Sequence, residues 1–359
     1  MNHKITTPLT FRSGHKMRNR FALAPLTNHQ CEDDGTVTDA EMKFLKMRAE
    51  GGFGLVMTCA AQIEPSGRGQ GFPGQLGVQH DRLLPGMKRI AEALKDTFSV
   101  VQIHHAGIRS PKEIIGQQPV GPSDHEKTGS RAMTNTEVKQ VIKDFIAAAV
   151  RCEKAGFDGV EIHGAHGYLL TQFLSTKHNL RTDEYGGSYE NRTRIVWEII
   201  AGIKQVCSAG FSFGIRLSPE GNGMPLREVT KFCQELIDEG SLDYLDISLW
   251  DCFKEPEEVE FQGRSLLSYF TDLNWGNVKL VVAGKLNTPQ DVEAIIDQGA
   301  DFVMLGRAGI LNHDFPNRYL ANPRFTAHQL PVTITHLEQE GVSPAFIKYL
   351  SGWDGFVKA

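Results

Sequence analysis

Polar side chains that can donate hydrogen bonds, move protons or bind metals stand where short apolar runs of this sequence end. His163 and His166 have a spacing that suits two metal ligands, but no third ligand is evident nearby, so we expect no metal ion. The alternative is an ordinary hydrogen-bonded pair. Gln102, Arg216 and Arg307 occupy or follow other apolar runs.

Each of these residues also has an ordinary structural interpretation. Gln102 could be a core amide whose hydrogen bonds are satisfied, and an inward-facing Arg216 could be paired with a carboxylate. Gly306 and Arg307 could form a turn that carries a surface charge. A functional site becomes the better interpretation only if the fold brings these residues to one place.

One structural unit recurs along the chain, in which a helical stretch ends at a glycine and a short apolar run follows. It occurs at 49–58, 154–163, 238–248 and 297–306. The glycines expected as helix C-caps with positive φ are Gly51, Gly156, Gly240 and Gly299. Helix starts are marked too, by a capping box from Thr134 to Glu137 and by Thr288, Pro289 and Asp291.

Eight apolar runs are candidate strands, and helical stretches separate them, although the stretch at 251–278 is poorly periodic. The runs lie near 21–26, 53–59, 99–104, 159–163, 212–217, 242–248, 279–283 and 302–306. Strict alternation predicts a parallel sheet, and eight units predict an α/β fold of the (β/α)₈ TIM-barrel type. A doubly wound open sheet competes, but no GxGxxG motif follows the first strand. We expect one domain over 1–359, with the barrel at about 19–325 and a C-terminal tail at about 326–359.

In such a barrel the carboxyl ends of all strands meet at one face, which would gather the polar residues there. Strands seven and eight end at Gly284 and Gly306, where barrels commonly bind phosphate. Glycine lets the backbone approach an anion closely, and Arg307 could add a bidentate contact. The sequence therefore predicts a phosphorylated ligand or cofactor.

Composition excludes several classes of protein. A net charge of −5 and a pI of about 6.2 argue against a nucleic-acid partner. No apolar run approaches the ~18–20 residues of a membrane span, and the first residues carry no apolar signal region. Six cysteines without a CxxC pair suit a reducing compartment. We expect a cytoplasmic protein without a membrane partner, as a monomer or homodimer.

The segment HGAHGYLLTQFLSTKHNLRTDEYGGSYENRTR at 163–194 is far more specific. It resembles the Old Yellow Enzyme family of FMN-dependent ene-reductases. Further matching segments are NRFALAPLT (19–27), VVQIHHAG (100–107), FGIRLSP (213–219) and VAGKL with GADFVMLGR (282–307). The resemblance implies a TIM barrel with one non-covalent FMN at the carboxyl face, and NADH or NADPH as the hydride donor.

The resemblance also implies which residues bind FMN. Thr27 would lie beside flavin O4, and Gln102 would bond the pyrimidine edge of the ring. Arg216 would sit near N1 and O2, where negative charge develops on reduction. Further expected flavin contacts are Ala24, Pro25, Leu26, Ala60 and Ala283. The phosphate would be held by Gly284, Lys285, Gly306 and Arg307.

For the substrate, the resemblance implies that His163 and His166 bond a carbonyl or nitro oxygen. In a ping-pong reaction, NAD(P)H would reduce the flavin, whose N5 then gives hydride to Cβ of an activated alkene while Tyr168 protonates Cα. His29 replaces a Tyr found in many bacterial members and is an expected substrate contact. Arg109 is displaced by one residue from the usual Ala-Gly-Arg, and the C-terminal tail matches no motif.

Two other functions remain open at this point. The same motifs would serve an FMN oxidoreductase with a different acceptor, such as a quinone, a nitrate ester or oxygen. A diverged barrel that binds a phosphorylated small molecule without redox chemistry is the third interpretation.

Overall fold

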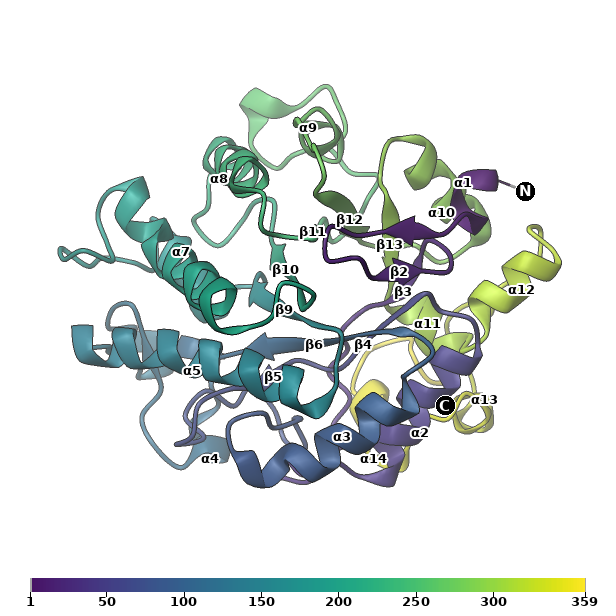
Figure 1. The fold of residues 1–359 in the computed structure, drawn as a ribbon, viewed down its shortest axis with the longest axis horizontal. Coiled ribbons are helices and arrows are strands. Elements are labelled where there is room, and N and C mark those ends of the chain that lie inside the picture. Colours follow the sequence, from purple (N-terminus) through teal and green to yellow (C-terminus); the bar gives the residue numbers. More distant parts are fainter. Residues whose placement is uncertain (1, 359) are drawn as a thin grey trace.

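A closed barrel of eight parallel strands, surrounded by helices, forms the centre of the molecule (Figure 1). The computed structural model describes residues 2–358. The barrel strands are β3 (Phe21–Leu23), β4 (Leu55–Met57), β6 (Phe98–His104), β9 (Gly159–Gly164), β10 (Ser212–Leu217), β11 (Tyr244–Ser248), β12 (Lys279–Ala283) and β13 (Phe302–Leu305). The ring closes because β4 pairs with both β3 and β6. The predicted TIM barrel is confirmed, and the open sheet is wrong.

Helices follow the strands in the order that the sequence predicts. They are α2 (Asp39–Glu50), α3 (Leu84–Ala93), α5 (Asn135–Ala155), α7 (Tyr189–Val206), α8 (Leu226–Glu239), α10 (Pro289–Asp297), α11 (Arg307–Leu311) and α12 (Phe315–Ala321). Between β11 and β12 the described chain forms only a 3-10 turn at Val259–Phe261 and the short α9 (Ser268–Thr271). This agrees with the weak periodicity of 251–278.

The remaining elements are short. At the N-terminus are α1 (His3–Thr6) and the hairpin strands β1 (Leu9–Thr10) and β2 (Lys16–Met17). The loops carry β5 (Ala61–Gln62), α4 (Lys112–Ile115), β7 (Val120–Gly121), β8 (Arg131–Ala132), α6 (Leu169–Leu174) and 3-10 turns at Asp81–Leu83, Gly107–Arg109 and Glu126–Thr128. The tail forms α13 (Ile334–Gln339) and α14 (Pro344–Ser351).

Local sequence signals set most of the helix ends. Capping boxes form from Thr134 to Glu137 and from Thr288 to Asp291. The predicted C-cap glycines Gly156, Gly240 and Gly299 have φ of 94°, 75° and 118°. The prediction for Gly51 is wrong, because its φ is −69° and the following Gly52 takes the left-handed conformation at 98°. There the chain turns one residue later than expected.

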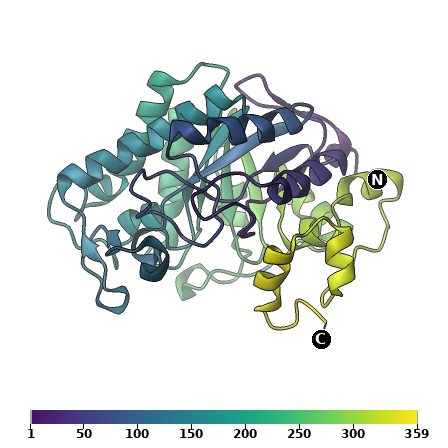
Figure 2. The ribbon, with the colours of Figure 1, turned by 90° about the horizontal axis from the view of Figure 1, so that it is seen from below.

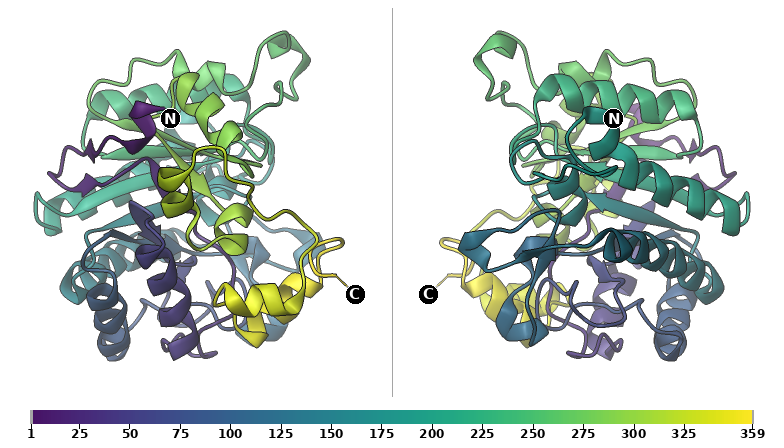
Figure 3. Two further views of the ribbon diagram at one scale, coloured as in Figure 1. Left: turned by 90° about the vertical axis from the view of Figure 1, so that its right-hand side faces the viewer. Right: turned by 90° about the vertical axis from the view of Figure 1, so that its left-hand side faces the viewer.

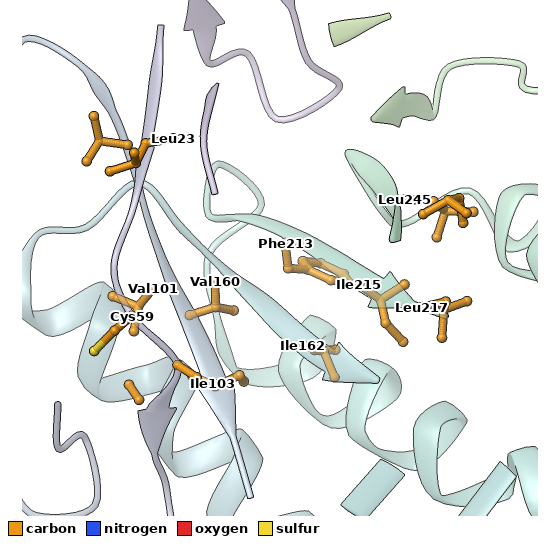
Figure 4. Close-up of a cluster of buried hydrophobic side chains, with 14 of the residues drawn as sticks. Leu23, Cys59, Val101, Ile103, Val160, Ile162, Phe213, Ile215, Leu217 and Leu245 are labelled. Atoms are coloured by element: carbon orange, nitrogen blue, oxygen red, sulfur yellow. The ribbon is translucent and has the colours of Figure 1, made fainter. Parts of the chain in front are cut away.

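Side chains along each strand alternate between two apolar layers, as the two-residue period of a strand requires. On β6, Val101 and Ile103 belong to the layer that packs against the helices, drawn in Figure 4. Phe98 and Val100 belong to a separate cluster inside the barrel. Phe11 of the N-terminal hairpin packs on Phe98 at a ring-centroid distance of 4.9 Å and closes the amino end of the lumen.

The second barrel strand is interrupted near the carboxyl face. Met57 pairs with Val100, whereas Ala61 of β5 pairs with Ile103 of the same neighbouring strand. The chain therefore advances four residues from Met57 to Ala61 while β6 advances three from Val100 to Ile103, which is a β-bulge. The bulge includes Ala60, and the strand predicted near 53–59 is shorter than expected, at Leu55–Met57.

The C-terminal segment packs beside α2, away from α7 and α8 (Figures 2 and 3). Phe346 of α14 contacts Phe44 of α2 at a ring-centroid distance of 5.6 Å. The Ser343 backbone N–H donates to Gln30 Oε1 at 3.2 Å, which ties the start of α14 to the loop after β3. None of the described helices is long and apolar enough to cross a membrane.

Candidate active site

A cavity of about 370 Å³ opens at the carboxyl ends of the barrel strands. It is lined by most of the residues predicted to contact a cofactor. These are Ala24, Pro25, Leu26, Arg216, Ala283, Gly284, Lys285, Gly306 and Arg307, joined by His166. Residues from the first, fifth, seventh and eighth barrel strands thus meet at one place, as the barrel requires. The volume falls in the range of ~300–1,000 Å³ that is usual for ligand sites.

A chain of hydrogen-bonded side chains crosses one wall of this cavity. His104 Nδ1 lies 2.9 Å from His163 Nδ1, and His163 Nε2 lies 3.1 Å from His166 Nδ1. His166 Nε2 lies 2.8 Å from Ser248 Oγ. Arg216 Nη2 donates to the same oxygen at 3.2 Å. The expected histidine pair is therefore part of a longer chain across four neighbouring strands and the loop after β9.

The three histidines of this hydrogen-bonded series are all held in the neutral form. Burial lowers the pKa of His104 to about 3, and neighbouring His105 and Arg109 lower it further. Burial also places the pKa of His163 and of His166 well below the usual value, with Arg216 and Arg109 adding positive charge nearby. A neutral imidazole carries one N–H, so each ring donates once and accepts once.

Tyr168 stands directly against these histidines. Its ring centroid lies 5.1 Å from that of His163 and 4.5 Å from that of His104. The guanidinium of Arg109 lies over the outer face of the Tyr168 ring, 4.5 Å from its centroid, and also donates to the His166 carbonyl oxygen. The phenol is therefore held between buried imidazoles and an exposed cation at the edge of the site.

Two buried carboxyl groups lie beneath the cavity in the barrel lumen. Gln102 Nε2 donates to Glu161 Oε1 at 2.7 Å, and Arg216 Nε lies 2.9 Å from Asp246 Oδ2. The ordinary interpretations of Gln102 and Arg216, a satisfied amide and a paired guanidinium, are thus correct. Burial raises the pKa of Glu161 to about 8 and that of Asp246 to about 6. The nearby charge of Arg216 opposes both shifts.

The opposite end of the cavity is exposed and rich in positive charge. No side-chain hydrogen bond or ion pair of Arg307 forms within residues 2–358, and Lys285 Nζ contacts Asp251 Oδ2 at 3.0 Å. A Cβ on Gly306 would meet only Leu26 Cδ2, at 3.7 Å, so this wall stays open. Gly284 has a φ of 154°, and a Cβ there would come within 2.8 Å of the Trp250 and Asp251 backbone. This end suits a bound phosphate.

Residues 4–323 match the model of the NADH:flavin oxidoreductase / NADH oxidase family. The chain belongs to this family. It is 38% identical over 313 residues to the probable NADH-dependent flavin oxidoreductase YqiG of Bacillus subtilis, covering 84% of this chain and 83% of that one. It is 32% identical over 317 residues to the NADH oxidase of Thermoanaerobacter brockii, covering 84% of this chain but only 48% of that protein.

Solved structures agree with this assignment. The Old Yellow Enzyme homologue of Zymomonas mobilis matches with a TM-score of 0.78 and 26% identity, over 93% of this chain and 96% of that one. Morphinone reductase in complex with tetrahydroNAD matches with a TM-score of 0.76 and 28% identity, over 93% of each chain. The chain is thus a flavin-dependent NAD(P)H oxidoreductase of the Old Yellow Enzyme type, and the non-redox alternative is not supported.

Several residues predicted for the site of this flavin oxidoreductase lie outside the lining of the 370 Å³ cavity. Gln102 and His163 are buried behind it. The Ala60 carbonyl accepts from Gln75 Nε2 at 2.7 Å, within the bulge. His29 is stacked between Phe72 and Tyr349, with ring centroids 5.5 Å and 4.5 Å away. Thr27 and Tyr168 both neighbour Tyr349.

Sequence reasoning missed four residues of the oxidoreductase site. Ser248 joins His166 to Arg216, and Trp250 and Trp353 line the cavity. Tyr349 reaches the site from α14, where no motif pointed. Ser248 could have been found, because Tyr244, Asp246 and Ser248 alternate along β11 and must share one face. The tail residues had no such signal, since their placement depends on how α14 packs on α2.

A second cavity of about 430 Å³ adjoins the first and shares His166, Ser248 and Trp250 with it. Its charged members are Arg109, Glu220, Lys254 and Glu257. Lys254 Nζ lies 2.6 Å from Glu220 Oε1 and 3.1 Å from Glu257 Oε1, so its charge is matched. Within the described chain, no group of three or more His, Cys, Asp or Glu is arranged to hold a metal ion.

Proposed function

We propose that this chain is an FMN-dependent NAD(P)H oxidoreductase that reduces activated C=C bonds of α,β-unsaturated carbonyl or nitro compounds. The observation that carries the proposal is the placement of the neutral pair His163 and His166 beside Tyr168, at the edge of the 370 Å³ cavity. Neutral N–H groups next to a phenol suit a reaction in which an oxygen gains negative charge while a neighbouring carbon gains a proton.

The residues around the cavity fit FMN. Arg307 and Lys285 offer positive charge beside Gly284 and the open backbone of Gly306, which suits the phosphate. Ala24, Pro25, Leu26 and Ala283 provide apolar walls, with Thr27 and Ala60 next to them. Arg216 and Gln102 would face the polar edge of the ring, each already fixed by a buried carboxyl group. When bound, FMN would supply hydride transfer between NAD(P)H and the alkene.

On the substrate side, residues of this protein would bind the alkene, orient it and protonate it. His163 and His166 would donate to the carbonyl or nitro oxygen and polarise the double bond, which requires a proton on the nitrogen that faces the oxygen. Tyr168 Oη would deliver the proton to Cα. Arg109 lies over the Tyr168 ring, and Tyr349, on which His29 stacks, is a further neighbour of Tyr168.

A different acceptor is the second candidate. One relative is named an NADH oxidase and another, in Desulforamulus reducens, a metal reductase. This chain spans 48% and 47% of those two proteins, so their activities need not be its own. A quinone, a nitrate ester or oxygen could accept the electrons with the same residues.

The test begins with the visible spectrum of the purified protein, followed by NADH and then NADPH under anaerobic conditions. We expect flavin absorption that bleaches with at least one donor. A colourless protein that takes up no added FMN would contradict the cofactor proposal. The reduced protein is then mixed with a neutral enone, a nitroalkene, a quinone, a nitrate ester and oxygen at equal concentration. Reoxidation that is far slower with the enone and the nitroalkene than with a quinone would favour the second candidate.

A further inference from the structure

A third histidine stands behind His163 and His166, of which His166 lines the cavity. His104 ends β6 and is buried, and its Nδ1 lies 2.9 Å from Nδ1 of His163 on the neighbouring strand β9. The motif that suggested His163 and His166 gives His104 no role. The nearest nitrogen atoms of His104 and His163 are both Nδ1, so one ring must donate and the other must accept.

Because each neutral imidazole carries one proton, the hydrogen bonds from His104 through His163 and His166 to Ser248 can run in only two directions. If His104 donates, His163 carries its proton on Nε2 and donates to His166, which then carries its proton on Nε2 and donates to Ser248. If the direction is reversed, Ser248 donates to His166, His166 to His163 and His163 to His104. A neutral ring allows no mixture, because each imidazole holds one proton.

Only one of these arrangements can hold a substrate oxygen. With His104 as donor, the ε nitrogens of His163 and His166 both carry protons and can turn toward an oxygen acceptor. In the reversed arrangement both ε nitrogens expose lone pairs, which repel the oxygen. We propose that His104 is a positioning residue that donates from Nδ1 and keeps the proton of His163 on Nε2, facing the substrate. The inference rests on the proposed function of His163 and His166.

The competing explanation is that His104 only fills space. Its ring packs edge-on against Tyr168 at a centroid distance of 4.5 Å, and a Cβ on Gly71 would lie 3.3 Å from His104 Nε2. A phenylalanine would satisfy that packing but supplies no donor. An asparagine places an amide N–H close to the position of the imidazole Nδ1. The two substitutions therefore separate packing from donation.

The experiment uses the holoenzyme, with 2-cyclohexenone as the neutral enone. For His104→Phe we expect KM for the enone to rise about tenfold, the effect of one lost hydrogen bond, while flavin reduction by NAD(P)H keeps its rate. His104→Asn should recover most of the loss. The matched control is His105→Phe, because His105 is the adjacent buried histidine and bonds Glu64 at 2.8 Å instead. It should leave KM for the enone unchanged.

The direct measurement is the ¹⁵N chemical shift of both His163 ring nitrogens in protein labelled at histidine. We expect a protonated Nε2 and a bare Nδ1 in the wild type with the enone's saturated ketone bound, and a mixture in His104→Phe. A protonated Nδ1 on His163 in the wild type would overturn the proposal, as would a His104→Phe variant with wild-type KM and shifts. If the wild type reduces no alkene, the proposed function fails, while the nitrogen shifts still test the donor at His104.

Discussion

The two ends of the cavity are built in opposite ways. At the histidine end, the polar atoms of His163, Arg216 and Gln102 are buried and already partnered by other side chains. At the phosphate end, Arg307 is exposed without a side-chain partner in the described chain, and Lys285 has a single carboxylate contact. Both ends come from strand termini of the same barrel, so the fold alone does not explain the difference.

The difference reflects what each end has to recognise. A phosphate needs positive charge and open backbone, and mobile cations on the surface supply both at little cost in stability. A developing charge on a flat ring or a carbonyl needs donors at fixed positions, which buried partners provide. We therefore expect substitutions at the histidine end to change the rate of alkene reduction and the free energy of unfolding. Substitutions at the phosphate end should change FMN binding alone.

The largest effect is expected for Tyr168→Phe. Loss of the proton donor should slow alkene reduction by about 10²–10⁴-fold, because positioned general acids contribute that much. Reduction of the protein by NAD(P)H should be unchanged. Stopped-flow measurement of the two half-reactions checks this. The matched control is Tyr349→Phe, which removes the neighbouring phenol from α14 and should slow neither half-reaction comparably. Wild-type rates for both half-reactions of Tyr168→Phe would exclude Tyr168 as the donor.

Of the variants considered, Arg216→Met should lower the free energy of unfolding the most. It leaves Asp246 buried without its cation, and breaking a buried ion pair from one side costs about 3–5 kcal/mol. The double variant Arg216→Met/Asp246→Leu should recover much of that loss, since apolar replacement of both partners is often tolerated. Urea unfolding without added flavin measures both.

The comparison residue for that experiment is Arg307 at the other end of the cavity. Arg307→Met should change the free energy of unfolding by no more than about 0.5 kcal/mol, as is usual for exposed sites. Equal losses for Arg216→Met and Arg307→Met would show that the two ends do not differ in the way the contacts indicate.

Much of the fold could be predicted because its signals are local. The capping boxes at Thr134 and Thr288 and the apolar runs fix where elements begin, and their alternation fixes the parallel sheet. Gly51 shows the limit, because Gly51 and Gly52 are equally able to take positive φ, and both pack closely against distant residues, His313 and Asn317. The bulge at Ala60 was hidden for a similar reason, since it follows from the register with β6.

The site could be predicted in part. Motifs pointed to His163, His166, Tyr168, Arg216 and the glycines, which the structure brings to the barrel mouth. They could not point to Tyr349 or Trp353, whose approach depends on contacts between α14 and α2. Nor could they point to the partners of Gln102 and Arg216. Glu161 and Asp246 lie in ordinary strands, and the register between neighbouring strands sets Glu161 beside Gln102 and Asp246 beside Arg216.

Arg307→Ala should weaken FMN binding without changing folding. Removal of a charge-assisted contact costs about 1.5–3 kcal/mol, which raises Kd by about ten- to a hundredfold. Lys285→Ala should have a smaller effect, because part of the lysine's charge is already matched by Asp251. Titration of the flavin-free protein with FMN, followed by flavin fluorescence, gives both values. An unchanged Kd for Arg307→Ala would place the phosphate elsewhere.

The last expected difference is a dependence of stability on pH that belongs to the buried end alone. Burial raises the pKa of Glu161 from 4.5 to about 8, so the folded protein keeps a proton that the unfolded chain loses as the pH rises above 4.5. Folding stability is then highest below that pH and falls up to about pH 8. Glu161→Gln removes this loss, so between pH 5.5 and 8 its free energy of unfolding should fall less steeply than that of the wild type. Asp251 provides the control at the exposed end, since hydrogen bonding to the Phe253 N–H lowers its pKa and its contribution is complete above its usual pKa. The difference between Asp251→Asn and wild type should therefore stay flat over the same interval in urea unfolding. Parallel curves for Glu161→Gln and wild type would mean that Glu161 is ionised in the folded barrel, and that the two ends of the cavity carry charge in the same way.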